Sequence, residues 1–142
     1  MRTKEEHLEE LKLNPNSFSD HNFYELETLE PDHAVCLLDI RKESLNPYGM
    51  VHGGNLYALA DEAAGTAAHS DGRHYVTQNG TLNFLNNRPR GIIRAEAKVR
   101  HRGRSTVLID VEIRSEDAAL LATGTFIYFR VDKSRMNERA AE

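Results

Sequence analysis

The chain has 142 residues, of which 28% are charged and 39% hydrophobic, and this balance is typical of a soluble globular protein with one domain and one sizeable core. The net charge of -4 and the isoelectric point near 6.0 argue against a general nucleic-acid binder. The single cysteine, Cys36, excludes an internal disulfide.

The N-terminal residues MRTKEEHLEE are charged and contain no apolar segment, so no secretory signal peptide is expected. No stretch approaches the roughly 20 apolar residues that a membrane span needs. Cys36 lies in the apolar run HAVCLLDI, which favours a small core residue over a nucleophile. A lone cysteine fits a reducing compartment, and the protein is expected to be cytoplasmic.

The first predicted element is a helix over residues 3–13, where Leu8 and Leu11 are spaced among acids and lysines. Pro15 is expected to end this helix, because proline disfavours helical geometry in the residue before it. Two strands are predicted next, separated by the turn PDH, at residues 23–29 and 33–40.

The longest regular element is predicted to follow Gly54. Its apolar positions form one stripe at helical spacing: Leu56, Leu59, Ala60, Ala63 and Ala67. Gly72, in the sequence SDGR, is expected to end this helix.

Four β-strands are predicted after the helix, at residues 75–85, 92–100, 105–114 and 120–131. Gly80 in the first of them suggests a bulge or a close backbone approach. The second and third alternate cleanly, with one face formed by Ile93, Ala95, Ala97, Val99, Val107, Ile109, Val111 and Ile113. The breaks NNRPRG, HRGR and SEDA are short and turn-like, which predicts an antiparallel meander.

A helix with an apolar stripe needs a sheet to cover it, and the economical arrangement is one curved antiparallel sheet wrapped around one long helix. The predicted fold class is therefore α+β. The expected division of the chain is an N-terminal helical extension over residues 1–20, the main domain over residues 21–132 and a charged C-terminal tail over residues 133–142.

Two glycines begin the long helix, and one acid lies inside it. Gly53 and Gly54 leave N–H groups at the positive end of the helix, where they suit a carbonyl oxygen that becomes an oxyanion. The alternative is that they only make a tight turn. Asp61 shares a flank with Gly65 and Ala68, and a carboxylate there can act as a nucleophile or general base. The alternative for Asp61 is an ordinary solvated helix acid.

The spacing of these residues constrains any shared site. Gly53 and Asp61 are eight residues apart, which is roughly 12 Å along a helix at about 1.5 Å per residue. One carbonyl group cannot reach the Gly53 N–H and the Asp61 carboxylate of the same helix. If both act on one bond, they come from two chains, so the spacing predicts a dimer with its helices antiparallel and close.

Further polar residues accompany this pair. His52 is a candidate for orienting a carbonyl and Asn46 for holding a water or the carbonyl, and each has a purely structural alternative. A basic cluster follows, which is either a solvated strand face or a phosphate site: Arg88, Arg90, Arg94, Lys98, Arg100, Arg102 and Arg104. No spacing of His, Asp and Glu resembles a metal motif, so no metal is expected.

The sequence NPYGMVHGG, followed by LAD, resembles the hotdog-fold acyl-CoA thioesterases, in particular the phenylacetate-pathway (PaaI-like) group. The resemblance covers about residues 18–131 and includes FL at residues 84–85 and HRGRS at residues 101–105. It implies a hotdog fold, dimers that often pair into tetramers, and hydrolysis of a small aromatic or short- to medium-chain acyl-CoA to the free acid and CoA. Coenzyme A is then part of the substrate, with no separate cofactor and no nucleic-acid or membrane partner.

The resemblance also implies roles for individual residues. Asp61 is the catalytic carboxylate, Gly53 N–H from the other subunit polarises the thioester carbonyl, and His52 and Asn46 position the thioester or the water. The implied substrate-binding residues are Gly54, Thr77, Gln78, Arg102, Arg104 and Ser105, the last three at the nucleotide end of coenzyme A.

Two other functions stand beside this one. A dehydratase of the same fold would need a His paired with an acid in a different motif, which the sequence lacks. A non-catalytic acyl-CoA-binding sensor would carry an extra DNA-binding segment, which the short stretch before the first strand is not expected to hold, and would not need Asp61.

Overall fold

The computed structural model describes residues 1–132, so the predicted tail over residues 133–142 lies outside the described residues. The elements, in chain order, are α1 (Lys4–Leu13), α2 (Ser17–His21), β1 (Tyr24–Glu30), β2 (His33–Asp39), the 3₁₀ turn η1 (Lys42–Ser44), α3 (Gly53–Ala68), the 3₁₀ turn η2 (His69–Asp71), β3 (His74–Phe84), β4 (Ile92–Arg102), β5 (Thr106–Ser115) and β6 (Leu120–Val131). Within residues 1–132, no helix is both long and apolar enough to cross a membrane.

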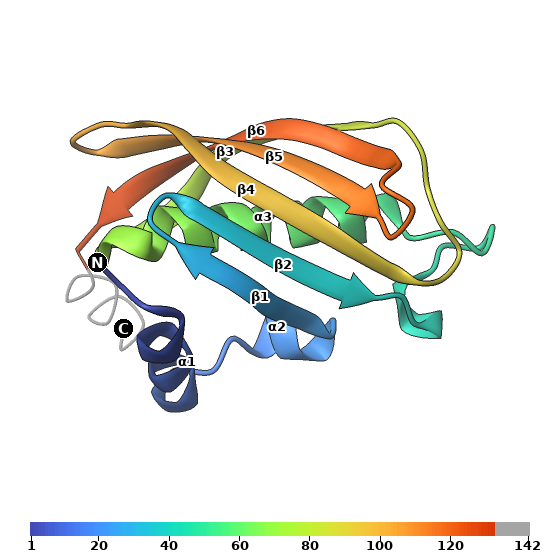
Figure 1. Ribbon diagram of the computed structural model, residues 1–142, viewed down its shortest axis with the longest axis horizontal. Helices are drawn as coiled ribbons and strands as arrows, with labels where there is room; N and C mark the ends of the chain where they lie inside the picture. The colour runs from blue at the N-terminus through green and yellow to red at the C-terminus, as the bar shows by residue number, and fades with distance from the viewer. Residues whose placement is uncertain (133–142) are drawn as a thin grey trace, which may run out of the picture.

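The strands form one six-stranded antiparallel sheet in the order β1-β2-β4-β5-β6-β3, and α3 lies along one face of it (Figure 1). The predicted α+β class and hotdog arrangement are confirmed. The predicted helix stripe is the buried face of α3, with Leu56, Leu59, Ala60, Ala63 and Ala67 all at most 1% exposed. Gly72 has a positive φ of 84° at the end of η2, which is the expected stop.

The antiparallel meander is only partly correct. β4, β5 and β6 do follow one another, but β3 pairs with β6 at the sheet edge and not with β4. The segment NNRPRG is therefore a crossover past two strands and not a hairpin turn. Its path is fixed by hydrogen bonds to Val51, two residues before α3: Asn87 Nδ2 donates to Val51 O at 2.8 Å, and Val51 N–H donates to Arg88 O at 3.3 Å.

The N-terminal segment lies below β1 (Figure 1). α1 begins with a capping box formed by Thr3 and Glu6 and ends at Leu13, with Asn14 as its C-cap immediately before Pro15, as expected. The short helix α2 was not predicted, because its single turn is too brief to show a periodic pattern; its N-cap is Asn16. None of the residues of α1 is buried.

Candidate active site

Two hydroxyl groups from the sheet hold the Asp61 carboxylate. The Thr77 hydroxyl on β3 donates to Asp61 Oδ1 at 2.8 Å, and the Tyr128 hydroxyl on β6 donates to the same oxygen at 2.6 Å. Among residues 1–132, Asp61 Oδ2 has no hydrogen-bond donor. A carboxylate oriented through one oxygen and open at the other is suited to act as a nucleophile or a general base.

Tyr128 is a site residue that the sequence did not reveal, because it is 67 positions from Asp61 and lies in the apolar strand FIYFRV. Its side chain is buried, and its hydroxyl also donates to the backbone carbonyl of Asp61 at 2.7 Å. Burial and the neighbouring Asp61 charge raise the pKa of Tyr128. The hydroxyl therefore remains a protonated donor at neutral pH.

The start of α3 carries one open donor. His52 is the N-cap residue, and its Nδ1 accepts a hydrogen bond from Gly54 N–H at 2.9 Å. Because the accepting nitrogen of a neutral imidazole carries no proton, this contact assigns the His52 proton to Nε2. Gly54 N–H is thus occupied, whereas Gly53 N–H makes no hydrogen bond among the described residues. The donor available to a ligand is that of Gly53, at the positive end of the helix.

Asn46 organises the turn that precedes α3. Its Oδ1 accepts from the N–H groups of Tyr48 and Met50 at 2.9 and 3.2 Å, and its own N–H donates to Met50 O at 2.7 Å. Within residues 1–132, the amide nitrogen Nδ2 has no acceptor. Asn46 therefore forms the turn, and the two N–H groups of its side-chain amide remain available to a ligand.

Thr77 and Gln78 lie on the exposed edge strand β3, whose second edge pairs with no strand in the described part of the chain. The register with β6 passes from Thr77 to Asn79, so Gln78 is the extra residue of a bulge. Gly80 shows the other predicted feature, a close approach, because a Cβ there would lie 2.6 Å from ring atoms of Phe126.

The structure does not bring Arg102 into a phosphate site. Its guanidinium donates to the last carbonyls of α3, Ala67 O at 3.2 Å and Ala68 O at 3.0 Å, and pairs with Asp32 and Asp71 at 2.9 Å each. A cation at this position satisfies the unpaired carbonyls at the negative end of the helix. Arg102 therefore fastens the end of α3 to the β1–β2 turn.

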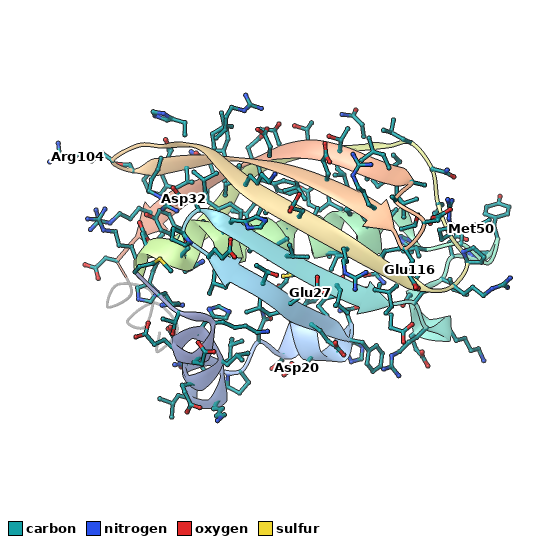
Figure 2. The ribbon with its side chains drawn as sticks, in the orientation of Figure 1. Asp20, Glu27, Asp32, Met50, Arg104 and Glu116 are labelled. Carbon is teal, nitrogen blue, oxygen red and sulfur yellow. The ribbon has the colours of Figure 1, made fainter. Side chains whose placement is uncertain are left out.

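Arg104 and Ser105 lie exposed at the tip of the β4–β5 hairpin, at the opposite end of the molecule from Met50 (Figure 2). They line an open basin of about 610 Å³ together with Gly72, Arg73, His74, Arg130, Val131 and Asp132. In the described part of the chain, the guanidinium groups of Arg73, Arg104 and Arg130 form no ion pair. Most of the predicted basic cluster is instead paired with acids of the sheet surface: Arg88 with Asp117, Arg94 with Glu27, Lys98 with Glu96 and Arg100 with Asp110.

A cavity of about 280 Å³ adjoins Asp61, and Gly65 and Tyr128 are also among the residues that line it. Histidines 7 and 69 lie on its walls, and burial lowers the pKa of both His7 and His69. Both imidazoles are therefore neutral at physiological pH.

The fold and the site define the class of protein. The model of the thioesterase superfamily matches residues 48–122, a range that includes α3 and Asp61, and the chain belongs to this superfamily. One relative is the acyl-coenzyme A thioesterase PaaI of Escherichia coli (strain K12), which is 32% identical over 96 residues, covering 67% of this chain and 69% of the relative.

Solved structures agree with this assignment. The structure of the E. coli PaaI protein from the phenylacetic acid degradation operon has a TM-score of 0.82 at 26% identity, covering 87% of this chain and 91% of that one. A hypothetical thioesterase from Streptococcus pneumoniae TIGR4, solved with coenzyme A, has a TM-score of 0.73 at 30% identity, covering 76% and 88% of the two chains.

Proposed function

We propose that this protein hydrolyses acyl-CoA thioesters, with Asp61 as the catalytic carboxylate. The observation that carries the proposal is the geometry of Asp61, whose Oδ1 is held by Thr77 and Tyr128 while Oδ2 has no donor among the described residues. The relatives add the substrate class, since one is an acyl-coenzyme A thioesterase and another was solved with coenzyme A. The acyl group is a small aromatic or a short to medium chain.

The reaction has two balanced routes. With Asp61 as a base, Oδ2 takes a proton from water, the hydroxide oxygen bonds to the thioester carbon, the C–S bond breaks, and the proton on Oδ2 passes to the departing thiolate. With Asp61 as nucleophile, Oδ2 bonds to that carbon and the thiolate leaves, and water then cleaves the resulting anhydride. Both routes release the free acid and the CoA thiol, and both pass through an oxyanion that a backbone N–H can stabilise.

The oxyanion donor comes from a second chain in this proposal. Gly53 and Asp61 both belong to α3, so about 12 Å of helix separates them and they cannot serve one carbonyl. The open edge of β3 beside Thr77 offers a surface on which a second copy can extend the sheet. The protein is then a homodimer, with pairing into tetramers as a further step. The Nε2–H of His52 and the Nδ2 of Asn46 are the remaining donors for the carbonyl or the water.

The nucleotide end of coenzyme A is assigned to the basin at the hairpin tip. Arg73, Arg104 and Arg130 offer three guanidinium groups that form no ion pair within residues 1–132, and Ser105 adds a hydroxyl. Arginine is well suited to phosphate, because its planar group donates two parallel hydrogen bonds. Arg102 is not part of this assignment, since its donors are engaged with α3 and two acids.

The test is thiol release from a panel of aromatic and aliphatic acyl-CoAs by the wild type, Asp61→Asn and Asp39→Asn. Asp39 is an exposed acid at the end of β2 and serves as the matched control. We expect Asp61→Asn to lower kcat by at least about 100-fold and Asp39→Asn to leave it unchanged. Near wild-type turnover by Asp61→Asn would refute its role. Tight acyl-CoA binding with no release by any form would indicate the non-catalytic sensor instead.

A further inference from the structure

The N-terminal helix α1 is held over α3 without joining the core. Hydrogen bonds to other elements hold the segment: Arg2 N–H donates to Ser70 O at 2.9 Å, Lys4 Nζ donates to Glu27 O at 2.9 Å, and Asn16 Nδ2 donates to Glu62 Oε1 at 3.1 Å. Yet none of the residues of α1 is buried. Hydrogen bonds therefore hold α1 over an open space, and its side chains are not packed into the core.

That space consists of two adjoining cavities. The front cavity, of about 280 Å³, reaches Asp61 and has His7 and Leu11 of α1 on its other side. It exceeds the roughly 150 Å³ cavity that holds one benzene molecule in an engineered protein core. The residues that bound both cavities are His7, Leu11, Asn16, Glu62 and Thr66.

The rear cavity, of about 290 Å³, lies farther under α1. Its lining includes the apolar side chains Leu8, Tyr24, Leu26 and Cys36. Cys36 is buried and burial raises the pKa of its thiol to about 12, so it acts as an apolar wall and not as a nucleophile. The wall formed by these four side chains suits an alkyl chain, and the polar remainder of the lining includes Ser19, Asp20, Glu25 and Glu62.

The residues that line both cavities include one hydrogen-bonded pair, Asn16 and Glu62. The Asn16 amide donates to both carboxylate oxygens of Glu62, at 3.1 and 3.3 Å. Asn16 is fixed in turn, because its Oδ1 accepts from Ser19 N–H at 3.2 Å as the N-cap of α2. Glu62 comes directly after Asp61 in α3. The pair is thus held in place on the lining that both cavities share, one residue away from the proposed reaction centre.

We propose that the front cavity is the acyl-binding pocket, that α1 forms its outer wall, and that the Asn16–Glu62 pair is its floor. The proposal rests on the proposed thioesterase function and adds a determinant of acyl length that lies largely outside the matched superfamily range of residues 48–122. Acyl groups that fit the front cavity are preferred, and longer chains are rejected because they meet the floor before the thioester reaches Asp61.

The wall is tested with a matched pair of substitutions on α1. Leu11 lines the front cavity, whereas Leu13 is 82% exposed and lines no part of either cavity. We expect Leu11→Trp to lower kcat/KM for the best short acyl-CoA by about tenfold or more, and Leu13→Trp to leave it unchanged. Equal kcat/KM in both variants and the wild type would overturn the assignment of α1 as the wall.

The floor is tested by the dependence of kcat/KM on chain length, from acetyl-CoA to dodecanoyl-CoA. We expect Glu62→Ala to raise the ratio of long-chain to short-chain kcat/KM by about tenfold or more, because one methylene in an apolar pocket already changes kcat/KM by about this factor. Glu62→Gln keeps an oxygen that accepts from Asn16 and should keep the wild-type ratio. Leu8→Trp, added to Glu62→Ala, fills the rear cavity from a partly exposed position and should abolish the gain.

These outcomes separate the two proposals. A wild type that hydrolyses no acyl-CoA refutes the thioesterase function itself. A wild type that hydrolyses acyl-CoA, with the same chain-length ratio in Glu62→Ala as in Glu62→Gln, leaves the thioesterase intact and overturns the floor. A gain in Glu62→Ala that survives Leu8→Trp also overturns it, since the longer chain would then lie elsewhere. Melting temperatures of all variants establish that each is folded.

Discussion

Gly65 and Tyr128 face each other across the gap between α3 and β6. A Cβ at position 65 would lie 2.9 Å from the Tyr128 hydroxyl oxygen and 3.1 Å from Cε2. The same hydroxyl donates to Asp61 Oδ1 and to Asp61 O. Glycine at position 65 is therefore what allows the tyrosine to reach the carboxylate one turn away, which gives the small-residue flank of the helix a physical reason.

We expect Gly65→Ala and Tyr128→Phe each to lower kcat by about tenfold, the equivalent of one lost hydrogen bond, with little change in KM. Alanine is a better helix former than glycine by about 1 kcal/mol, so lost activity in Gly65→Ala would not arise from an unfolded helix. Steady-state kinetics and melting curves provide the measurement. Unchanged kcat in a folded Tyr128→Phe would exclude a positioning role for the hydroxyl.

A second prediction concerns the two-chain site. Gly53 is the first residue of α3, where proline is well tolerated, and His52 already has the extended ψ of 134° that suits a residue before proline. Gly53→Pro therefore removes the N–H and keeps the helix. We expect Gly53→Pro and Asp61→Asn to be inactive alone.

When the two are unfolded and refolded together, half of the dimers are mixed, and each mixed dimer contains one intact site. About a quarter of the wild-type activity should return. Each variant refolded alone is the control. A mixture that stays inactive, although size-exclusion chromatography shows dimers, would contradict a site shared between chains.

A third prediction contrasts two arginines of one hairpin. Arg102→Ala removes the side-chain donor to the last two carbonyls of α3 and should lower the free energy of unfolding by about 1–3 kcal/mol, measured by urea denaturation. Arg104→Ala should leave that free energy unchanged and raise KM for acyl-CoA by about tenfold. If Arg102→Ala raises KM and Arg104→Ala does not, the prediction is wrong and Arg102 belongs to the phosphate site.

A fourth prediction concerns pH. Burial lowers the pKa of His69 below 6.5 in the folded protein, although the Gly65 carbonyl opposes the shift. The unfolded chain then binds more protons, so this contribution to stability is complete above about pH 6.5 and is lost as the pH falls below it. The melting temperature from pH 7.5 to 5.5 should fall less steeply in His69→Gln than in the wild type. The exposed His21→Gln is the control, and equal slopes in all three would contradict the prediction.

Local patterns were sufficient for most of the fold. The alternation in β4 and β5 and the stripe of α3 correctly assign the core, because burial on one face imposes a period on the sequence. The pairing of β3 with β6 could not be predicted from such patterns. Alternation shows which face of a strand is buried and not which neighbour it has, and a seven-residue connection serves a hairpin or a crossover equally.

Only part of the candidate site could be predicted from the sequence. Gly53, His52 and Asp61 lie within one short motif, so their proximity to α3 follows from the sequence. Tyr128 comes from a distant strand, and only the topology of the sheet brings it to Asp61. For Arg102 the sequence was misleading. Its position in a basic run suggested a phosphate ligand, but it pairs with Asp32 and Asp71, which come from other turns.

The absence of buried residues in α1 has a consequence for how this protein can diversify. A segment that contributes nothing to the core can be exchanged, lengthened or redesigned without re-optimising the sheet that carries Thr77 and Tyr128. With α1 as the proposed wall of the acyl pocket, a few substitutions in this helix can change the substrate preference while Asp61, Thr77 and Tyr128 stay unchanged.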